Sequence, residues 1–356
     1  MSRDPSLSIR LVRSPACVDE AWPWDLLSSH LEAAGHRVET CSSAWAPTAP
    51  APDVIHCLGL SAASGLAVED QSAPVIVTPC ADDAGDRTAP TPLLTTSASV
   101  VRSSVERTRM HQLGIPWSRT WVLPAAVDVD TFTRLGPMAR RTDRFRLVTE
   151  MGGPDDGIED VITAVARLGD VELAVLAGET GSAGASSARE TVLRAVAAEA
   201  GMSDRLVVAT PSSPGERAWW LRSAHVAVAV PHTPGRSDFV AEAMACGVAV
   251  VASRVDALAD LVIHGVTGFL VPTADPLSVA RAVRVVLADD FSIESYGMAA
   301  ADRALSRFAW PRVVHELVGV YGRVAAMDRG AGYEAEETTP DEREVPVLLG
   351  GSTRGV

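Results

Sequence analysis

The sequence predicts an α/β protein made of two Rossmann-like, doubly wound domains that face each other. Three observations support this fold class. The chain has 356 residues, which is too long for one ordinary core and suits two domains of roughly 150 residues each. Short apolar runs alternate with amphipathic stretches, the pattern of a parallel sheet flanked by helices. The same alternation starts again after residues 124–137, an extended segment with few periodic apolar side chains.

Each half supplies several expected elements. In the first domain, residues 1–135, we expect strands at 8–12, 38–41, 52–57 and 74–78, and helices at 24–34 and 99–113. In the second domain, residues 136–327, we expect strands at 144–149, 171–177, 205–209, 226–230 and 248–252, and helices at 158–168, 188–200 and from 240 onward. A last helix at 310–324 would close the second domain or cross back onto the first. Ligands of such domains bind at the carboxyl ends of the strands, so we expect them near the cleft between the two halves.

The end of the chain differs in composition. Residues 328–356 are rich in Gly, Glu, Thr and Pro and carry little apolar content to bury, which predicts an acidic disordered tail. A partner-binding tail is the alternative.

Composition and charge limit the possible partners. The net charge of −14 disfavours non-specific binding to nucleic acid or anionic lipid. The longest apolar runs, such as 171–177 and 224–230, are far shorter than the roughly 20 residues that a membrane span needs. The first residues lead straight into a strand-like stretch, so no secretory signal is visible and we expect a cytoplasmic protein.

Two residue types are missing altogether. The chain contains neither lysine nor asparagine, which together with its richness in Ala, Val and Arg suggests a G+C-rich bacterial source. Any clamp for phosphate must therefore use arginine, helix N-termini or backbone amides. The five cysteines are widely spaced and form no Cys-x-x-Cys pair. We expect free, mostly buried thiols, and neither a disulfide framework nor a metal site.

Several segments carry a family resemblance. The run VPHTPGRSDFVAEAMACGVAVVAS at 230–253, the run DLVIHGVTGFLVP at 260–272 and the run DPLSVA at 275–280 resemble the signature of the family-four retaining glycosyltransferases. In the first half, AGHRV at 34–38 and LPAAVDVDTF at 123–132 resemble that family's corresponding positions. The resemblance covers about residues 10–325 and is specific in the second half.

This resemblance implies a GT-B fold and transfer of a hexosyl group with retention of configuration. The donor would be a nucleotide-diphosphate sugar bound mainly by the second domain, and the first domain would hold a small-molecule or glycan acceptor. No metal and no further cofactor is implied. Without a metal, positive side chains and helix N-termini must stabilise the charge that builds on the leaving diphosphate.

The resemblance also implies a role for Glu242. It matches the second glutamate of the family's Glu–seven residues–Glu motif, which is expected to hold the nucleotide ribose. A carboxylate suits this role because it can accept hydrogen bonds from two adjacent hydroxyls. The alternative is a glutamate near a helix N-terminus, stabilised by the helix dipole.

The loop before Glu242 departs from the family pattern. The first glutamate of the motif falls on Pro234, which has neither a side-chain acceptor nor a backbone N–H. Asp238 is a nearby carboxylate that a shifted loop could present instead. Gly235 and Ser237 could bring backbone amides close to a sugar. Arg236 could reach a phosphate bidentately, or it is a solvated surface arginine.

The expected phosphate clamp is also altered. The family's arginine and lysine fall on Met151 and Asp156, and Glu150 and Asp155 add negative charge nearby. Gly152 and Gly153 could offer amides to a phosphate, or they form a simple turn. In the first domain, the family's cleft histidine falls on Cys80, and residues 16–22 lack the family's Gly-Gly loop.

Two functional hypotheses follow. The first is an active retaining glycosyltransferase with rearranged donor contacts, which depends on the extended match and on Glu242. The second is a catalytically impaired homologue that acts as a binding subunit or as the partner of another protein. It depends on the joint changes at Met151, Asp156, Pro234 and Cys80. A dinucleotide oxidoreductase is disfavoured because no Gly-x-Gly-x-x-Gly follows the first strand.

Overall fold

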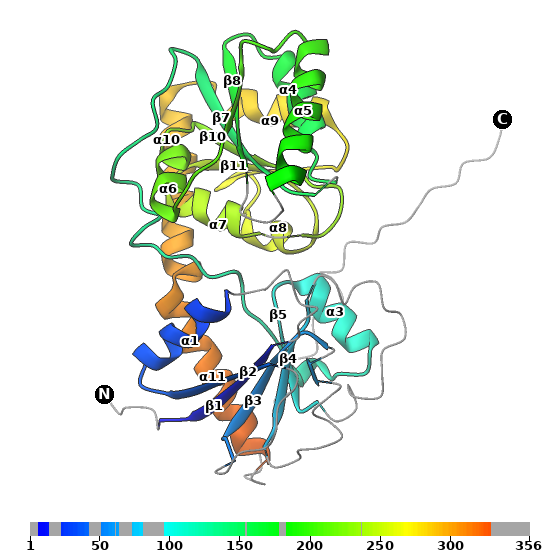
Figure 1. Cartoon of the computed structure of the whole chain (residues 1–356), viewed down its shortest axis with the longest axis vertical. Coiled ribbons are helices and arrows are strands. Elements are labelled where there is room, and N and C mark those ends of the chain that lie inside the picture. Colours follow the sequence, from blue (N-terminus) through cyan, green and yellow to red (C-terminus); the bar gives the residue numbers. More distant parts are fainter. Residues whose placement is uncertain are drawn as a thin grey trace, which may run out of the picture.

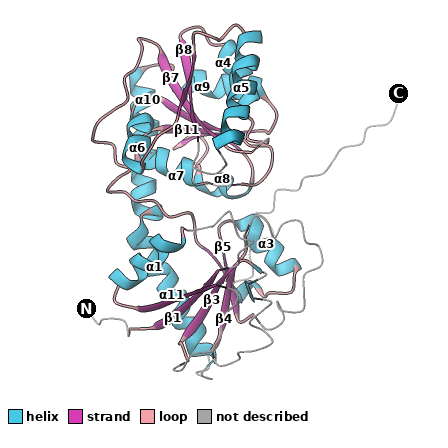
Figure 2. Ribbon diagram, in the orientation of Figure 1, coloured by secondary structure: helices cyan, strands magenta, loops and turns pink. Residues whose placement is uncertain are grey.

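The structure contains two parallel sheets of six strands each. It is a computed structural model and describes residues 6–13, 23–42, 51–60, 62–63, 73–80, 96–153, 155–177, 183–235 and 237–328. The sheets lie one above the other along the long axis of the molecule, with helices on their faces (Figures 1 and 2). This confirms the predicted α/β fold of two doubly wound halves. The predicted tail lies outside the described residues, apart from its first residue.

The first sheet has the strand order β2-β1-β3-β4-β5-β6, and all its pairings are parallel. Its strands are β1 (Ser8–Arg13), β2 (Arg37–Ser42), β3 (Val54–Leu58), β4 (Val75–Thr78), β5 (Ala98–Val101) and β6 (Thr120–Val122). Its helical elements are α1 (Trp24–Ala33), α3 (Ser104–Gln112) and the 3-10 turn η3 (Trp117–Arg119). Strands β3 and β5 are buried along their whole length, as expected for a parallel sheet covered on both faces.

One predicted element of the first half is wrong. We expected a single helix at 99–113, but Ala98–Val101 forms β5 and the helix α3 begins only at Ser104. The buried β-branched pair Val100-Val101 favours a strand. Ser103 then caps the helix, because its hydroxyl accepts a hydrogen bond from the Glu106 amide.

The second sheet has the strand order β12-β11-β10-β7-β8-β9. Its strands are β7 (Phe145–Met151), β8 (Val171–Ala177), β9 (Leu206–Ala209), β10 (Val226–Ala229), β11 (Ala249–Ser253) and β12 (Gly268–Val271). Its helices are α4 (Ile158–Ala166), α5 (Ala183–Glu199), α6 (Pro214–Arg222), α7 (Asp238–Ala245), α8 (Asp256–Leu261), α9 (Pro276–Val286) and α10 (Asp290–Arg303), the last continued by the π-helical turn η4 (Ala304–Phe308). Two apolar clusters fill its two faces.

The last helix, α11 (Trp310–Asp328), returns to the first sheet (Figure 1). Its apolar side chains pack in one cluster with residues of β1, β3, β4, β5 and α1. The Trp310 ring stacks on His30 of α1 at a centroid distance of 4.7 Å. Of the two alternatives for this helix, crossing back is therefore correct. Next to the start of α11, the extended linker (residues 124–137) pairs with the end of η4, since the Val127 amide donates a hydrogen bond to the Phe308 carbonyl at 2.7 Å.

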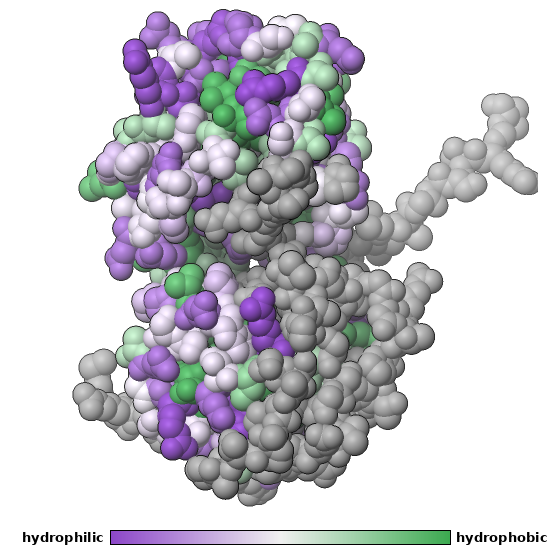
Figure 3. Space-filling view, viewed as in Figure 1, coloured by the Kyte–Doolittle hydropathy of each residue, from purple (hydrophilic) through white to green (hydrophobic). Residues whose placement is uncertain are grey.

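The surface shows how well the apolar side chains are covered. On the face seen in Figure 3, hydrophilic side chains are spread over the upper half, and apolar side chains form only separate patches. No helix among the described residues is both long enough and apolar enough to span a bilayer.

Candidate functional site

The order of the second sheet predicts which edge of it binds a ligand. The chain runs from β7 outward to β8 and β9 and then returns to the other side of β7 with β10. This reversal is a topological switch point, and ligands of open α/β sheets bind outside the carboxyl ends of the strands at such a point. The loop after β7 (152–157) and the loop after β10 (230–237) therefore border the candidate site.

The two loops contact each other closely. The His232 amide donates to the Asp155 carbonyl at 2.9 Å. Gly157 has a φ of +73°, and a side chain there would place its Cβ 2.0 Å from the Val230 carbonyl oxygen. Glycine is thus required both by the left-handed backbone and by the neighbouring loop.

A three-residue ionic cluster lies at this end of the sheet. Glu150 comes from the end of β7, Arg217 from α6 and Glu242 from α7. The Arg217 Nε donates to Glu242 Oε2 at 2.6 Å, and its Nη1 lies 2.8 Å from Glu150 Oε1. The guanidinium also lies over the Phe239 ring, 5.7 Å from its centroid. The side chains of Arg217 and Glu242 are only 14% and 17% exposed, so most of their charge is removed from water.

The electrostatics of Glu242 follow from its burial. Burial raises the pKa of its carboxyl to about 7, an effect that Glu150 and Asp238 reinforce and that Arg217 opposes. Burial alone would lower the Arg217 pKa, but the two carboxylates outweigh it and the pKa is raised. Arg217 is therefore a fixed cation, and it favours the charged form of Glu242.

A second ionic cluster shapes the loop after β7. Asp156 accepts from the Gly152 amide at 3.1 Å and from the Ile158 amide at 3.1 Å. Arg189 of α5 pairs with Asp156 at 2.6 Å and with Glu159 at 2.5 Å. The hydrogen bond from Arg189 lowers the pKa of Glu159. The Asp156 carboxylate thus fixes the conformation of the loop by accepting hydrogen bonds from two of its backbone amides.

The remaining predicted residues take different places. Met151 is 6% exposed and packs in the core beneath α4, so it presents nothing to the crevice. The Gly152 amide is engaged by Asp156, whereas Gly153 and Gly235 are exposed at the two loops. Ser237 is buried directly before α7, and Asp238 is the first residue of that helix. Arg236 lies outside the described residues.

Sequence reasoning missed Arg217. The pattern of α6 could have revealed it, because Arg217 is a charged residue on the buried face of that helix. It precedes the buried Ala218 and stands four residues before the buried Leu221. A cation at such a position is expected to have an acidic partner.

One cysteine expectation is wrong. Cys80 is disulfide-bonded and 6% exposed, so its sulfur is not the free thiol that we expected. Cys41, Cys57 and Cys246 are free. In the described part of the chain, no group of three or more His, Cys, Asp or Glu side chains is placed to hold a metal ion.

The two halves also touch each other where α3 meets α8. Ser103 and Ser104, at the start of α3, face Asp256 and Asp260 of α8. The Ser104 amide donates to Asp260 Oδ2 at 2.6 Å and its hydroxyl to Asp260 Oδ1 at 3.0 Å. The Ser103 hydroxyl contacts Asp256 Oδ1. The second half thus caps the positive end of a helix in the first.

Two parallel α/β halves joined by a linker and a returning helix, with loops at the carboxyl ends of the second sheet, define a GT-B glycosyltransferase fold. Residues 144–289 match the family model described as Glycosyl transferases group 1. The chain is 34% identical over 226 residues to the D-inositol 3-phosphate glycosyltransferase of Xylanimonas cellulosilytica, a match that covers 59% of this chain and 52% of that protein. This match therefore spans about half the length of that relative.

Two further comparisons extend over both halves. The D-inositol 3-phosphate glycosyltransferase of Acidothermus cellulolyticus is 28% identical over 340 residues, covering 90% of this chain and 72% of that one. The solved structure of Anabaena HepE in complex with UDP and glucose superposes with a TM-score of 0.70 at 14% identity, covering 89% of this chain and 99% of that chain. The family model thus matches the second half of this chain, whereas the similarity to the second relative and to the HepE structure extends over both halves.

Proposed function

We propose that the chain binds a nucleotide-diphosphate sugar in the crevice between the loops after β7 and β10 and transfers its hexosyl group with retention. The observation that carries the proposal is Glu242, a carboxylate at the switch point that is held by Arg217 at 2.6 Å. Its remaining acceptor capacity suits a pair of ribose hydroxyls. The same assignment is supported by two comparisons. The relatives are named as glycosyltransferases, and the HepE structure contains UDP and glucose.

The transfer breaks one bond and forms one. The bond between the sugar's anomeric carbon and the diphosphate oxygen breaks, and the electron pair leaves with the diphosphate. The acceptor's hydroxyl oxygen bonds to the anomeric carbon on the same face, and the hydroxyl proton passes to the departing diphosphate. Because the Arg217 and Glu242 side chains are only 14% and 17% exposed, a cation there stabilises the leaving charge more strongly than it would in solvent.

The acceptor belongs to the first half. The relatives are named for D-inositol 3-phosphate, which makes this compound the first acceptor to test with the present chain.

A second candidate function has its own observation. Met151 is buried in the core, and Asp156 is an acidic residue that forms an ion pair with Arg189. Neither position therefore presents a cation to a diphosphate. A homologue that binds a nucleotide or a protein partner without turnover fits this arrangement.

Thermal unfolding with a panel of nucleotides tests the proposal. UDP, GDP, ADP and their hexose conjugates are added in turn, and a ligand at 100 times its Kd should add about 2.7 kcal/mol of stability. We expect one nucleotide to stabilise the wild type and not Glu242→Ala, with the surface change Glu190→Ala as the matched control. If no nucleotide stabilises the wild type, the proposal is wrong.

Turnover separates the two candidates. The stabilising sugar nucleotide is incubated with D-inositol 3-phosphate and the anomeric configuration of the product is read by NMR. A retained product supports the transferase. Binding without release of nucleoside diphosphate, with or without acceptor, supports the impaired homologue.

A further inference from the structure

Arg217 has donors that its two carboxylate partners do not use. Its Nε donates to Glu242 and its Nη1 pairs with Glu150. Among the residues that the structure describes, its Nη2 has no hydrogen-bond partner, and this atom is not one of the buried side-chain nitrogens left unsatisfied. Nη2 therefore reaches solvent and keeps its two N–H groups for a ligand.

The position of Arg217 suits a phosphate. Glu150 immediately precedes Met151, the position that by resemblance should carry the phosphate-binding arginine, and Arg217 contacts Glu150 at 2.8 Å. Glu242, the expected ribose ligand, lies on its other side. A diphosphate joined to a ribose on Glu242 would thus lie within reach of the same guanidinium. Arginine suits this task because its planar fork can bind a carboxylate and a phosphate at once.

We propose that Arg217 is the phosphate-binding cation of the donor site, and that it replaces from α6 the cations missing at Met151 and Asp156. Its Nε orients Glu242 for the ribose, and its Nη2 donates to the diphosphate. The inference rests on the proposed function and names the residue that makes the site work in this chain. Glu150 is then a competing partner, which offsets part of the positive charge that a diphosphate would meet.

The test compares a diphosphate with its own nucleoside. UDP, GDP and ADP are titrated calorimetrically into the wild type, and the diphosphate that binds is measured beside uridine, guanosine or adenosine. In Arg217→Met we expect the preference for the diphosphate over the nucleoside to fall at least about tenfold, the scale of a lost charge-assisted hydrogen bond. Arg217→Lys should recover part of the preference. The matched control is Arg194→Met on α5, whose ion pair is half-exposed.

A gain of affinity removes the ambiguity of misfolding. Glu150→Gln takes away a like charge beside the diphosphate and leaves Arg217 on Glu242, so UDP or its counterpart should bind about fivefold more tightly. A wild type that binds no diphosphate overturns the proposed function. A wild type that binds, with the preference unchanged in Arg217→Met and no gain in Glu150→Gln, overturns the role of Arg217 alone.

Discussion

At the scale of single residues, His56 shows how the first half tolerates a titratable group in its core. This side chain of β3 is fully buried, with Nδ1 2.7 Å from the Tyr321 hydroxyl and Nε2 2.8 Å from the Thr78 hydroxyl. Both ring nitrogens are therefore satisfied in the neutral form. Burial lowers the His56 pKa from 6.5 to about 3. The contact with Tyr321 also joins α11 to the sheet.

This lowered pKa predicts an acid-sensitive fold. Between about pH 3 and 6.5, His56 takes up a proton in the unfolded chain but not in the folded one. Its contribution is therefore complete above about pH 6.5 and is lost as the pH falls, by up to about 1.4 kcal/mol per pH unit. Thermal unfolding from pH 7 to 4 should show a shallower decline in His56→Gln than in the wild type, although this variant starts less stable at pH 7. Equal slopes would mean that His56 is protonated within the fold.

The places of residues in the fold were predictable only where the local sequence determines them. Glu242 lies on α7 as expected, because the apolar run around it specifies the helix and its buried face. The partners of Glu242 were not predictable, since Arg217 and Glu150 come from other elements and meet it only after folding. The disulfide at Cys80 is also a tertiary feature that cysteine spacing left open.

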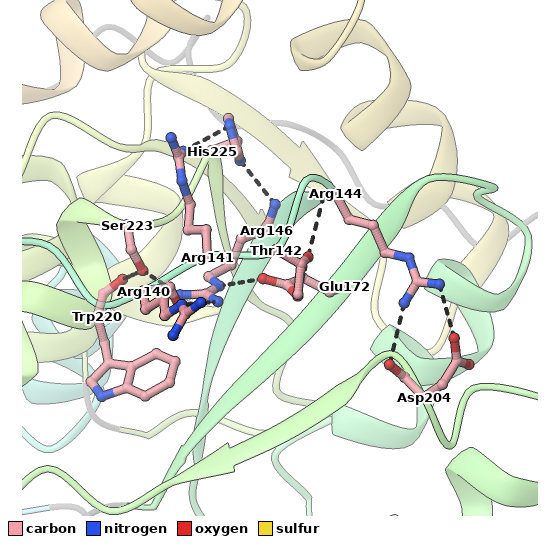
Figure 4. A network of polar contacts seen from close by, with 10 residues as sticks. All are labelled: Arg140, Arg141, Thr142, Arg144, Arg146, Glu172, Asp204, Trp220, Ser223 and His225. Carbon is pink, nitrogen blue, oxygen red and sulfur yellow. Dashed lines mark hydrogen bonds and ion pairs between the residues drawn. The ribbon is translucent and has the colours of Figure 1, made fainter.

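At the scale of elements, the second sheet is held at its amino edge by a buried ion pair. Arg146 of β7 donates from Nε to Glu172 of β8 at 2.7 Å, and both side chains are 2% exposed. Figure 4 shows the surrounding contacts: Thr142 on Glu172, Ser223 and the Arg140 carbonyl on Arg146, and the Trp220 ring beside the guanidinium. Thr142 donates to Glu172, whereas the Ser223 hydroxyl and the Arg140 carbonyl accept from Arg146, so the segment before β7 and the end of α6 both hold the pair in place.

Breaking this pair should destabilise the second half without touching the site. Arg146→Met leaves Glu172 buried and unpaired, which costs about 3–5 kcal/mol. Adding Glu172→Met should recover much of the loss, because the double variant buries no charge. Nucleotide affinity should stay at the wild-type value in the double variant, since Arg146 and Glu172 lie near the amino ends of their strands. A double variant no more stable than Arg146→Met would contradict this account.

The loop after β7 allows a matched pair of glycine changes. Gly157→Ala requires a φ of +73° and puts a methyl group 2.0 Å from the Val230 carbonyl oxygen, so the two loops at the crevice must separate. We expect a loss of about 1–3 kcal/mol from the backbone alone and weaker nucleotide binding. Gly153→Ala is the control, because no atom lies within 4 Å of the added Cβ. Calorimetry and thermal unfolding of both variants check this, and equal behaviour would refute the requirement for glycine.

Helices and strands were predictable where their apolar pattern fits one kind of element only. The strands β7 to β11 fall where their apolar runs predict, because buried parallel strands have few other interpretations, whereas β12 was not predicted. The region at 99–113 was misassigned because a four-residue buried strand directly before a helix merges with the helical pattern.

At the scale of the whole molecule, the linker, α11 and the α3–α8 contact relate the halves in the part of the chain that the structure describes. The linker and α11 cross between the halves, and the α3–α8 contact joins them at a helix that follows β11 of the second sheet. Nothing in the sequence indicated this contact, because Ser104 and Asp260 are 156 residues apart. Asp256 holds its place with a φ of +39°, a backbone region that Asp and Asn tolerate better than most residues.

Removing the carboxylates from this contact should loosen the closed arrangement. Each carboxylate at a helix N-terminus contributes about 0.3–1 kcal/mol when exposed, so Asp256→Asn combined with Asp260→Ala should weaken the contact by about 1–2 kcal/mol. Asparagine is chosen at 256 because it keeps the positive φ. We expect a larger radius of gyration by small-angle scattering at low salt, and a smaller difference at high salt, where such charges are screened.

Asp143→Asn, an exposed loop change, is the control. An unchanged radius in the double variant would show that the linker and α11 alone hold the two halves together.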